Sequence, residues 1–301
     1  MEHVPLNTSE RMTDSQLKAL LLATENLMLS IATQTDANPI NDLIRYHLDS
    51  GGGRVRAQLA LTAGIALGLK ADVCVSLAGC CELVHNASLL HDDIQDKDTK
   101  RRGKEAAWSY FDTNTAMCAG SLMLSAAFEA VSQVRKDTAI LVQHLNRRTA
   151  DLIRGQAQDL HSQSTDFDTN SYLRMAACKS GSLFALPIEL ALIASGKTSQ
   201  LACAKSAGES FAGAYQIADD LQDLEDDLQR ENCNLVSVFL KQGMAFEQAI
   251  GESGKLLDTY LELALHNTNL LPHDCGWKLR QLCESLKQTF DAESNLNCEQ
   301  T

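Results

Sequence analysis

Two acidic clusters constrain the folding of this chain more than any other feature of its sequence. Both have the form DDxxD within a helical apolar pattern, and they comprise Asp92, Asp93 and Asp96 in the first cluster and Asp219, Asp220 and Asp223 in the second. On a helix, the first and last Asp of such a motif share a face. Two facing helices would gather all these carboxylates around one cavity, where like charges repel and resist desolvation. Since Mg²⁺ binds carboxylates together with substrate phosphates, the motifs predict a metal-bridged diphosphate site.

The composition predicts one large helical domain. The chain has 301 residues, of which 45% are hydrophobic and only 5% aromatic, with four prolines. Abundant Ala and Leu favour helices, and this length is sufficient for a single core. We therefore expect an all-α domain over residues 1–301, with a flexible N-terminal segment over 1–14 and a flexible C-terminal tail over 292–301.

Apolar periodicity and cap residues place the individual helices. Asp14 is expected to cap the first helix, and Pro187 is expected to kink or interrupt an apolar helix over 183–194. The predicted helices run over about 14–32, 40–48, 54–69, 73–96, 107–133, 138–161, 169–195, 200–228, 234–241, 244–265 and 276–290.

The net charge and the cysteine content argue against several classes of protein. The net charge of −13 argues against a chain-wide basic surface for nucleic acid. The ten cysteines include no CxxC pair, and the opening residues lack an apolar signal core, so we expect reduced thiols in a cytoplasmic protein. No run of 18 uncharged apolar residues occurs, so no membrane span is expected.

Cationic residues near the motifs extend the predicted site. Arg101 and Arg102 follow the first cluster in the sequence RRG, and arginine can hold phosphate oxygens through two parallel hydrogen bonds. Arg54 and Arg56 follow a triple glycine, whose backbone can approach an anion closely. The sequence therefore supplies the positive charge that a diphosphate requires.

Several further polar residues have both a functional and a structural interpretation. His85 lies two helical turns before the first cluster, and Lys179 interrupts an apolar helix where a buried ammonium needs a partner. Alone, His85 is more typical of a core or a surface, and Lys179 could extend its amine to solvent. Asp226 and Asp227 fit a solvated helix end, while Asp98 fits either the metal site or the start of a loop.

Three segments carry a resemblance to a known family. They are residues 82–93, which read ELVHNASLLHDD, residues 216–223, which read QIADDLQD, and Gly155-Gln156 with Asp159. They resemble the trans-isoprenyl diphosphate synthases, which are head-to-tail prenyltransferases. The resemblance implies an isoprenoid synthase-type bundle of about ten or more helices around a central cavity. It also implies a cytoplasmic homodimer that condenses isopentenyl diphosphate with an allylic prenyl diphosphate.

The resemblance implies a role for each matching residue. The ligands of about three Mg²⁺ ions would be Asp92, Asp93, Asp96, Asp219, Asp220 and Asp223. The catalytic residues would be Asp92, Asp93, Lys179, Ser180, Gln216 and Asp219, with Ser180 and Gln216 steadying an allylic cation through oxygen dipoles. The allylic diphosphate would bind Arg101 and Lys179, and isopentenyl diphosphate would bind Arg54, Arg56, His85 and Arg102.

The chain departs from the family pattern at two cationic positions. The family's GGKxxR reads GGGRVR here, so Gly53 replaces a lysine, and Arg54 is the candidate substitute. After Asp223 the chain reads LEDDLQRENCNLVSV, which lacks the family's lysine, and Arg230 or Lys241 is the candidate there. Loss of a charged hydrogen bond costs roughly 1.5–3 kcal/mol, about ten- to a hundredfold in binding.

Two alternative functions follow from these departures. Weak binding of isopentenyl diphosphate would leave a terpene synthase-like or coupling enzyme that only ionises an allylic diphosphate. A non-catalytic partner subunit is the other alternative, and the intact Asp92 and Asp219 argue against it.

The resemblance also bears on product length. Ala87 and Ser88, five and four residues before Asp92, stand where a bulky aromatic side chain would stop growth at about fifteen carbons. Small residues leave the channel open and favour twenty carbons or more, although Met123 or Phe128 could still close it, so the expected product has about 15–20 carbons or is longer.

Overall fold

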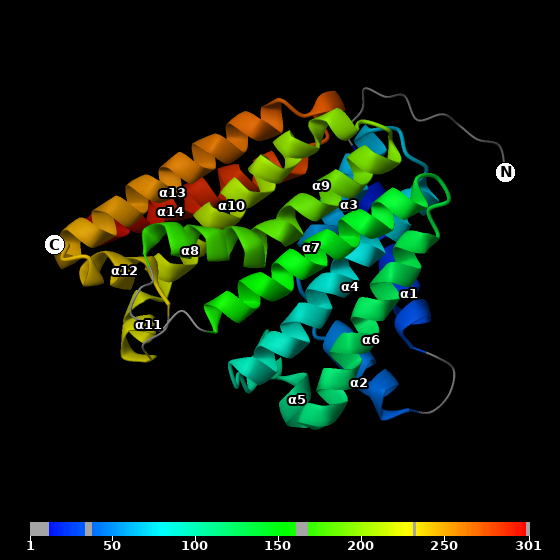
Figure 1. Cartoon of the computed structure of the whole chain (residues 1–301), viewed down its shortest axis with the longest axis horizontal. Coiled ribbons are helices and arrows are strands. Elements are labelled where there is room, and N and C mark those ends of the chain that lie inside the picture. The colour runs from blue at the N-terminus through cyan, green and yellow to red at the C-terminus, as the bar shows by residue number, and fades with distance from the viewer. Residues whose placement is uncertain (1–11, 34–37, 161–167, 231–232, 299–301) are drawn as a thin grey trace. The chain divides into compact units, whose positions relative to one another are not determined.

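The chain is described here by a computed structural model that covers residues 12–33, 38–160, 168–230 and 233–298. Within these residues the secondary structure is helical apart from one hairpin of two short strands, which confirms the predicted all-α class (Figure 1). Residues 1–11 of the predicted N-terminal segment and 299–301 of the predicted tail lie outside the described residues.

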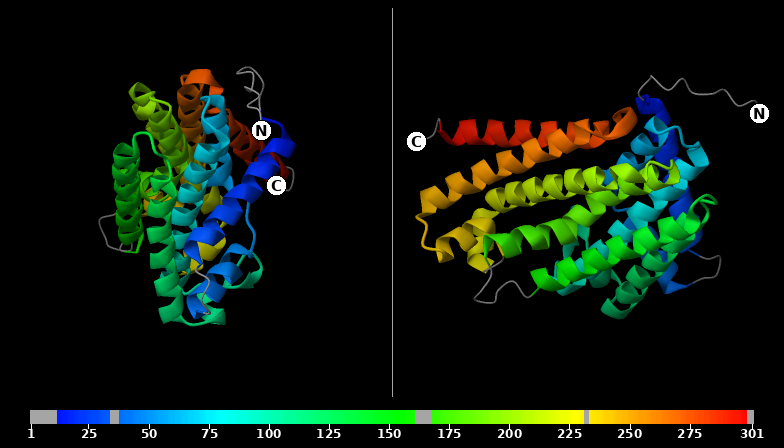
Figure 2. Two further views of the ribbon diagram at one scale, coloured as in Figure 1. Left: turned by 90° about the vertical axis from the view of Figure 1, so that its right-hand side faces the viewer. Right: turned by 45° about the horizontal axis from the view of Figure 1, so that its top comes forward.

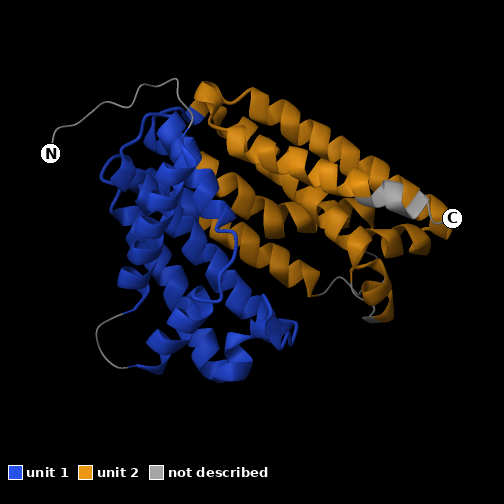
Figure 3. Cartoon of the chain, turned by 180° about the vertical axis from the view of Figure 1, so that it is seen from behind, with its two compact units in different colours: residues 1–145, 190–198 blue, residues 146–189, 199–301 orange. Residues whose placement is uncertain are grey.

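The helices form two compact units (Figure 3). Unit 1 comprises residues 1–145 and 190–198, and unit 2 comprises residues 146–189 and 199–301. Two helices contribute residues to both units, and they are α7 (Thr138–Asp159) and α9 (Ser182–Ala194). The organisation as a single domain over 1–301 stays a prediction.

Unit 1 is built around one long helix, α4 (Ala71–Gln95). The other elements of the unit are α1 (Asp14–Ala32), α2 (Pro39–Leu48), α3 (Val55–Ala66), β1 (Lys100–Arg101), β2 (Lys104–Glu105), α5 (Ala107–Tyr110) and α6 (Thr113–Ser132). The central helix packs against α1, α3, α5 and α6. Leu77 and Leu83 of α4 are fully buried, as are Leu61 of α3 and Met123 of α6, so these helices share one core.

Unit 2 is likewise built around one helix, α10 (Leu201–Gln222). The other elements are α8 (Thr169–Ala176), the π-helical turn η1 (Ala177–Gly181), α11 (Leu224–Arg230), α12 (Leu235–Lys241), α13 (Phe246–Asn269), the 3₁₀ turn η3 (Pro272–Asp274) and α14 (Trp277–Cys298), with the 3₁₀ turn η2 (Thr198–Gln200) at the junction with unit 1. The central helix contacts α8, η1, α11, α12, α13 and α14. The two longest C-terminal helices, α13 and α14, pack along each other (Figure 2).

Local capping chemistry explains where the first helices begin. Thr13, rather than the predicted Asp14, caps α1 through a capping box in which the Gln16 amide donates to Thr13 Oγ1 at 3.3 Å and the Thr13 amide donates to Gln16 Oε1 at 2.9 Å. Asn38 caps α2, where Pro39 occupies the first turn without costing a hydrogen bond.

The structure corrects several predicted helix limits. The predicted helix over 107–133 is two helices, because Asp112 accepts a hydrogen bond from the Thr115 amide at 2.9 Å and starts α6 anew. The predicted helix over 200–228 ends at Gln222, with α11 following. Helix α14 continues to Cys298, where the sequence predicted a helix to about 290 and a flexible tail from 292.

Pro187 does not interrupt its helix. Helix α9 runs through Pro187, and the residues beside it, Leu186 and Ile188, are fully buried. The irregularity lies instead at η1, where the helix widens to π geometry just before α9 begins. Packing on both sides of Pro187 therefore holds the helix despite its missing amide donor.

Three described segments are long and apolar enough to cross a membrane by length and composition, which the sequence analysis did not anticipate. They are Ala71–Gln95, Thr113–Ser132 and Thr169–Ala194. In the structure 72% and 78% of the apolar windows of the first and third are buried, against 44% for the second. The apolar character of the first and third is therefore accounted for by burial inside the protein.

Candidate active site

Each acidic motif closes the central helix of its unit. Asp96 is the C-cap of α4, and its amide donates to the Asp92 carbonyl at 2.8 Å. Asp223 is the C-cap of α10, and its amide donates to the Asp219 carbonyl at 2.9 Å. The C-terminus of a helix already carries partial negative charge, so clustered carboxylates there are unfavourable without cations. Helix stability alone does not explain this placement.

In unit 1 the three aspartates differ in environment. Asp93 is 1% exposed, and its Oδ1 accepts a hydrogen bond from Arg101 Nε at 2.5 Å. Burial raises the pKa of Asp93, and the Arg101 guanidinium opposes that rise. Its other oxygen, Oδ2, is buried without a hydrogen-bond partner. Asp92 is half-buried and Asp96 is exposed, so these two carboxylates are the accessible ones.

The loop after the first motif is held by its backbone. The Asp98 amide donates to the Asp93 carbonyl at 3.0 Å, and the Asp98 carbonyl accepts from Trp108 Nε1 at 2.7 Å. These bonds support the interpretation of Asp98 as the start of the loop. They lead into the hairpin of β1 and β2, in which Lys100 pairs with Glu105.

Arg102 lies directly against the glycine-rich loop. Its guanidinium donates to the Gly51 carbonyl, and a Cβ added at Gly52 would lie 2.4 Å from Arg102 Cζ. Gly52 also has φ +115°, a conformation that side chains disfavour. Lys104 donates to the Asp49 carbonyl of the same loop at 3.1 Å. Two cations thus hold the loop that carries the triple glycine.

Two histidines, the buried His47 and the half-buried His85, lie close enough to Arg101 and Arg102 to feel their charges. His85 was predicted as a site residue, whereas His47, on α2, was not. Burial and the charges of Arg102 and Arg101 lower the pKa of His47 to about 3. Burial and the charge of Arg56 lower the pKa of His85 well below its usual range. Both rings are therefore neutral at pH 7, and His47 Nε2 and His85 Nδ1 are buried without hydrogen-bond partners.

Unpartnered buried nitrogens beside several arginines are typical of an anion site. The buried Glu82 is committed elsewhere, since its Oε1 accepts from the Ala57 amide at 3.0 Å and its Oε2 accepts from Asn86 Nδ2 at 3.3 Å. Burial, Arg54 and Arg101 lower the pKa of Arg102. An added anion would offset this repulsion and supply acceptors to the buried rings.

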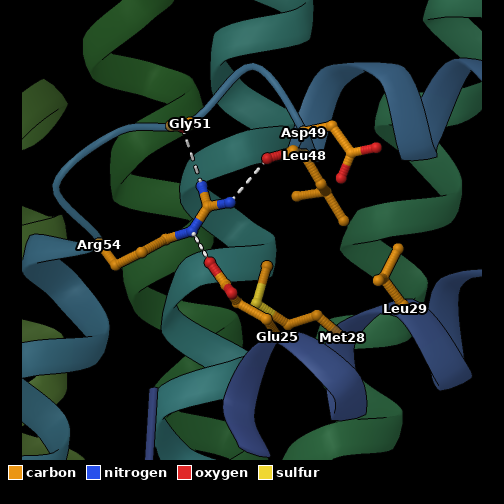
Figure 4. A pocket seen from close by; sticks show the side chains of 7 residues that line it. All are labelled: Glu25, Met28, Leu29, Leu48, Asp49, Gly51 and Arg54. Atoms are coloured by element: carbon orange, nitrogen blue, oxygen red, sulfur yellow. Dashed lines mark hydrogen bonds and ion pairs between the residues drawn. The ribbon is translucent and has the colours of Figure 1, made fainter. Parts of the chain in front are cut away.

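Arg54 is engaged within the protein (Figure 4). Its Nε donates to Glu25 Oε1 at 2.9 Å, and its other two nitrogens donate to the Leu48 carbonyl at 2.7 Å and the Gly51 carbonyl at 3.2 Å. These residues line a cavity of about 250 Å³ between α1 and the end of α2. The contacts engage all three guanidinium nitrogens and give Arg54 a structural role in the loop, which disfavours it as a substrate ligand.

In unit 2 the π-helical turn η1 presents Lys179 and Ser180, both half-buried. The Lys179 ammonium forms an ion pair with Asp159 at the end of α7. A Cβ added at Gly155 would lie 2.4 Å from the Lys179 backbone nitrogen, so only glycine permits this approach of α7 to the turn. Single π turns are frequent at functional sites.

The aspartates of the second motif also differ in environment. Asp219 and Asp223 are exposed and one turn apart on α10. Protein atoms crowd one side of the Asp219 carboxyl although the residue is exposed, and this desolvation raises its pKa. The charges of Asp223 and Asp227 raise the pKa of Asp219 further, and Lys179 opposes the rise. Asp227, which the sequence assigned to a solvated helix end, accepts a hydrogen bond from Asn234 Nδ2 at 2.9 Å. Its charge also acts on Asp219, whose pKa it raises.

Asp220 faces the interior of unit 2. Its Oδ1 accepts from Gln216 Nε2 at 2.9 Å, and its Oδ2 accepts from the Tyr172 hydroxyl at 2.7 Å and from the Leu235 amide at 2.6 Å. Burial raises its pKa to about 7, against the effect of these hydrogen bonds. Both oxygens accept hydrogen bonds from protein groups, which disfavours Asp220 as a metal ligand.

The residues predicted to set product length lie on α4. Ala87 is fully buried, and Ser88 is half-buried with its hydroxyl donating to the His85 carbonyl at 2.8 Å. On α6, which packs against α4, Met123 is fully buried and Phe128 is half-buried.

The donor set fits a metal that arrives with its substrate. Within the part of the chain that the structure describes, no group of three or more His, Cys, Asp or Glu side chains lies close enough to hold a metal ion. Asp92 and Asp96 in unit 1, and Asp219 and Asp223 in unit 2, each offer a pair of accessible carboxylates. Mg²⁺ typically combines one or two carboxylates with substrate phosphates and water, so the residues present suit it.

Comparison with known proteins identifies the family of the chain. The family model described as polyprenyl synthetase matches residues 37–235, which is more than half of the chain. The chain belongs to the polyprenyl synthetase family. It is 31% identical over 233 residues to a (2E,6E)-farnesyl diphosphate synthase of Mycobacterium bovis. That match covers 72% of this chain and 65% of the relative, so the chain spans slightly less than two thirds of that relative's length.

Solved structures of polyprenyl synthetases share the fold. A geranyltranstransferase of Thermotoga maritima is 26% identical, with a TM-score of 0.77 over 92% of this chain and 99% of its own. A geranylgeranyl pyrophosphate synthetase of Geoglobus acetivorans is 24% identical, with a TM-score of 0.80 over 90% of this chain and 98% of its own. The chain therefore has the isoprenoid synthase-type helical fold that its motifs predicted.

Proposed function

We propose that this chain is a head-to-tail trans-prenyltransferase that condenses isopentenyl diphosphate with an allylic prenyl diphosphate. One observation carries the proposal. Each acidic motif ends the central helix of its unit and lies beside cations of that unit, Arg101 in unit 1 and Lys179 in unit 2. Carboxylates and cations together are what a metal-bound diphosphate requires. The mycobacterial relative, named as a farnesyl diphosphate synthase, supports the same assignment.

Mg²⁺ is the proposed cofactor, with about three ions per site when substrate is present. Asp92 and Asp96 in unit 1 and Asp219 and Asp223 in unit 2 are the proposed ligands, because these four are accessible. Asp93 is proposed to act through Arg101, which it orients by a buried ion pair. Bound Mg²⁺ supplies Lewis acidity that spreads the charge of a departing diphosphate.

The cations divide between the two substrates in this proposal. Arg101 and Lys179 bind the allylic diphosphate, and Arg56, His85 and Arg102 bind isopentenyl diphosphate. The buried and unpartnered His85 Nδ1 supports the second group, since an N–H there can donate to a phosphate oxygen. Lys104, which already contacts the glycine-rich loop, is the proposed substitute for the lysine missing at Gly53.

The proposed chemistry needs protein groups that tolerate a carbocation. The allylic C–O bond breaks, and its electron pair leaves with the diphosphate. The double bond of isopentenyl diphosphate then forms the new C–C bond, and loss of a proton to the departed diphosphate completes the product. Ser180 and Gln216 steady the cation through their oxygen dipoles.

Product length and assembly are also part of the proposal. The small Ala87 and Ser88 favour a product of about twenty carbons or longer, as the family resemblance implies. A homodimer is part of the proposal, as the family resemblance implies, and the large apolar side chains that α5 and α6 expose, Tyr110, Met117 and Leu122, support it. The nine cysteines with described side chains are free thiols, which supports a cytoplasmic location.

Matched carboxylate variants test the assignment. Release of diphosphate should require Mg²⁺ together with both substrates, and Asp92→Asn and Asp219→Asn should each reduce it at least about a hundredfold. Asp226→Asn, an exposed carboxylate on α11 outside both motifs, is the control and should retain wild-type turnover. Unchanged turnover in both motif variants would overturn the proposal.

A further inference from the structure

Two neighbouring aspartates of the second motif have opposite surroundings. Asp219 is exposed, whereas Asp220 is 2% exposed. Successive residues on a helix point about 100° apart, so only one of them can face a site while the other faces the core. Asp220 faces the core and receives three hydrogen bonds, from Gln216 on its own helix, Tyr172 on α8 and Leu235 on α12.

We infer that Asp220 is a positioning residue that fixes the orientation of the Gln216 side chain. The Gln216 amide nitrogen lies 2.9 Å from Asp220 Oδ1, and Tyr172 and Leu235 donate to the other oxygen, so the nitrogen end of the carboxamide faces Asp220. The two ends of a carboxamide lie on opposite sides of its carbon, so Gln216 Oε1 is then turned away from Asp220. The inference deepens the proposed function, on which its catalytic meaning rests.

The orientation matters because the two ends of the carboxamide carry opposite partial charges. An oxygen presented to a developing carbocation stabilises it, whereas an NH₂ group in the same place repels it. In water an amide reorients freely, but a fixed dipole costs no reorganisation at the moment of reaction. Asp220 therefore selects the useful end of the Gln216 side chain.

The surrounding network keeps Asp220 itself in place. Tyr172 is fully buried and donates its hydroxyl at 2.7 Å, and the Leu235 amide at the start of α12 donates at 2.6 Å. Asn234, also fully buried, donates to the Asp220 carbonyl at 2.7 Å and to Asp227 at 2.9 Å. Three helices thus converge on a single carboxylate, which leaves it little freedom to rotate.

Asp220→Asn is the decisive variant. The asparagine oxygen can still accept from Tyr172 and Leu235, but its NH₂ group now faces Gln216. The Gln216 amide should therefore turn over and present nitrogen where it presented oxygen. We expect kcat to fall about 10- to 100-fold with KM for both substrates unchanged. The Mg²⁺ concentration for half-maximal rate should also be unchanged.

Two further variants give the comparison. Tyr172→Phe removes one hydrogen bond to Asp220 and should lower kcat several-fold without a change in Mg²⁺ dependence. Tyr260→Phe is the matched control, because Tyr260 on α13 also packs against α10, at Gly213, and should retain wild-type kcat. A shift of Mg²⁺ dependence in Asp220→Asn like that of Asp219→Asn would make Asp220 a metal ligand and overturn the inference. Wild-type kcat in Asp220→Asn would also overturn it.

A spectroscopic readout separates this inference from the proposed function. The side-chain ¹⁵NH₂ signal of Gln216 should show slow solvent exchange in the wild type and in Tyr260→Phe, and should shift and exchange faster in Asp220→Asn. If the wild type forms no chain-extended product, the proposed function fails while this measurement still decides the orientation of Gln216. An unchanged Gln216 signal in Asp220→Asn would contradict the positioning role.

Discussion

At the residue scale, the arginines and histidines of unit 1 lie close enough together to destabilise one another's charged forms. Burial and like charge lower the pKa values of His47, His85 and Arg102. Two of the arginines form ion pairs with carboxylates, Arg54 with Glu25 and Arg101 with Asp93. Such an arrangement disfavours the folded state unless an anion binds. Binding of a diphosphate would therefore improve both the electrostatics and the hydrogen bonding of this cluster.

His47→Gln should make the stability of the protein less dependent on pH. The pKa of His47 is about 3 in the folded chain and near 6.5 when unfolded. Between these values the unfolded state binds the extra proton, so the free energy of unfolding falls as the pH decreases, by up to ~1.4 kcal/mol per pH unit from this residue. Between pH 7.5 and 5, the free energy of unfolding should therefore fall by about 2 kcal/mol less in His47→Gln than in the wild type.

Urea unfolding at the two pH values measures the difference. His266→Gln, on an exposed position of α13, is the control and should keep the wild-type slope. Equal slopes for the wild type and His47→Gln would mean that His47 is not held neutral in the fold.

Ala87→Phe should shorten the product. Ala87 is fully buried on α4, one turn before the first motif, and a phenyl ring there would occupy space that the proposal assigns to the growing chain. We expect a shift towards products that are shorter by one or more five-carbon units, measured by mass spectrometry. Ala78→Phe is the control, because Ala78 is equally buried but lies on the opposite face of α4, 180° around the helix.

Both Phe variants overpack a core and should each lose about 1–3 kcal/mol of stability. Only Ala87→Phe should change product length. Identical products from both variants and the wild type would show that Ala87 does not line the channel.

At the scale of elements, the sequence predicted most helices but not their junctions. Apolar periodicity was sufficient to predict the helices over 14–32, 40–48 and 138–161, because it is amphipathic there. The break at Asp112 and the π turn over 177–181 depend on capping and on the close approach of another helix. Neither leaves a periodic signal in the sequence.

The sequence motifs predicted some residues of the candidate site and missed others. The motifs identified Asp92 and Asp219, whose accessibility the structure describes, but not the burial of Asp220, because period alone does not say which Asp faces the core. His47 was missed since a lone histidine in an apolar helix carries no motif. Its place six residues before the last glycine of the triple-glycine loop was the one available signal.

Gly155→Ala should destabilise the junction between α7 and the π turn. The added Cβ would lie 2.4 Å from the Lys179 backbone nitrogen and 2.8 Å from the Cys178 carbonyl carbon. Backbone atoms cannot give way locally, so the turn must move, and we expect a loss of roughly 1–3 kcal/mol by chemical denaturation with lowered turnover.

Gly251→Ala is the matched control for that variant. Gly251 lies inside α13, and a Cβ there meets nothing within 4 Å. Helix propensity alone predicts a gain of about 0.5–1 kcal/mol. Equal and small effects of the two substitutions would mean that α7 does not approach the π turn closely.

At the scale of the whole molecule, neither unit carries a complete metal site within the described residues. Mg²⁺ alone should therefore raise the melting temperature little, and inorganic diphosphate with Mg²⁺ should raise it by several degrees, since a ligand stabilises in proportion to its affinity for the folded state. Asp219→Asn should abolish the combined effect in a thermal unfolding assay. A large stabilisation by Mg²⁺ without diphosphate would contradict the account.

The proposed reaction of this member of the polyprenyl synthetase family joins isopentenyl diphosphate to an allylic diphosphate. The most direct measurement is mass spectrometry of the products formed from dimethylallyl, geranyl or farnesyl diphosphate, with and without isopentenyl diphosphate, in the presence of Mg²⁺. We expect prenyl diphosphates longer than the starter by whole five-carbon units, formed only when isopentenyl diphosphate is present. Terpene alcohols or hydrocarbons formed equally well without isopentenyl diphosphate, or no conversion of any starter, would contradict it.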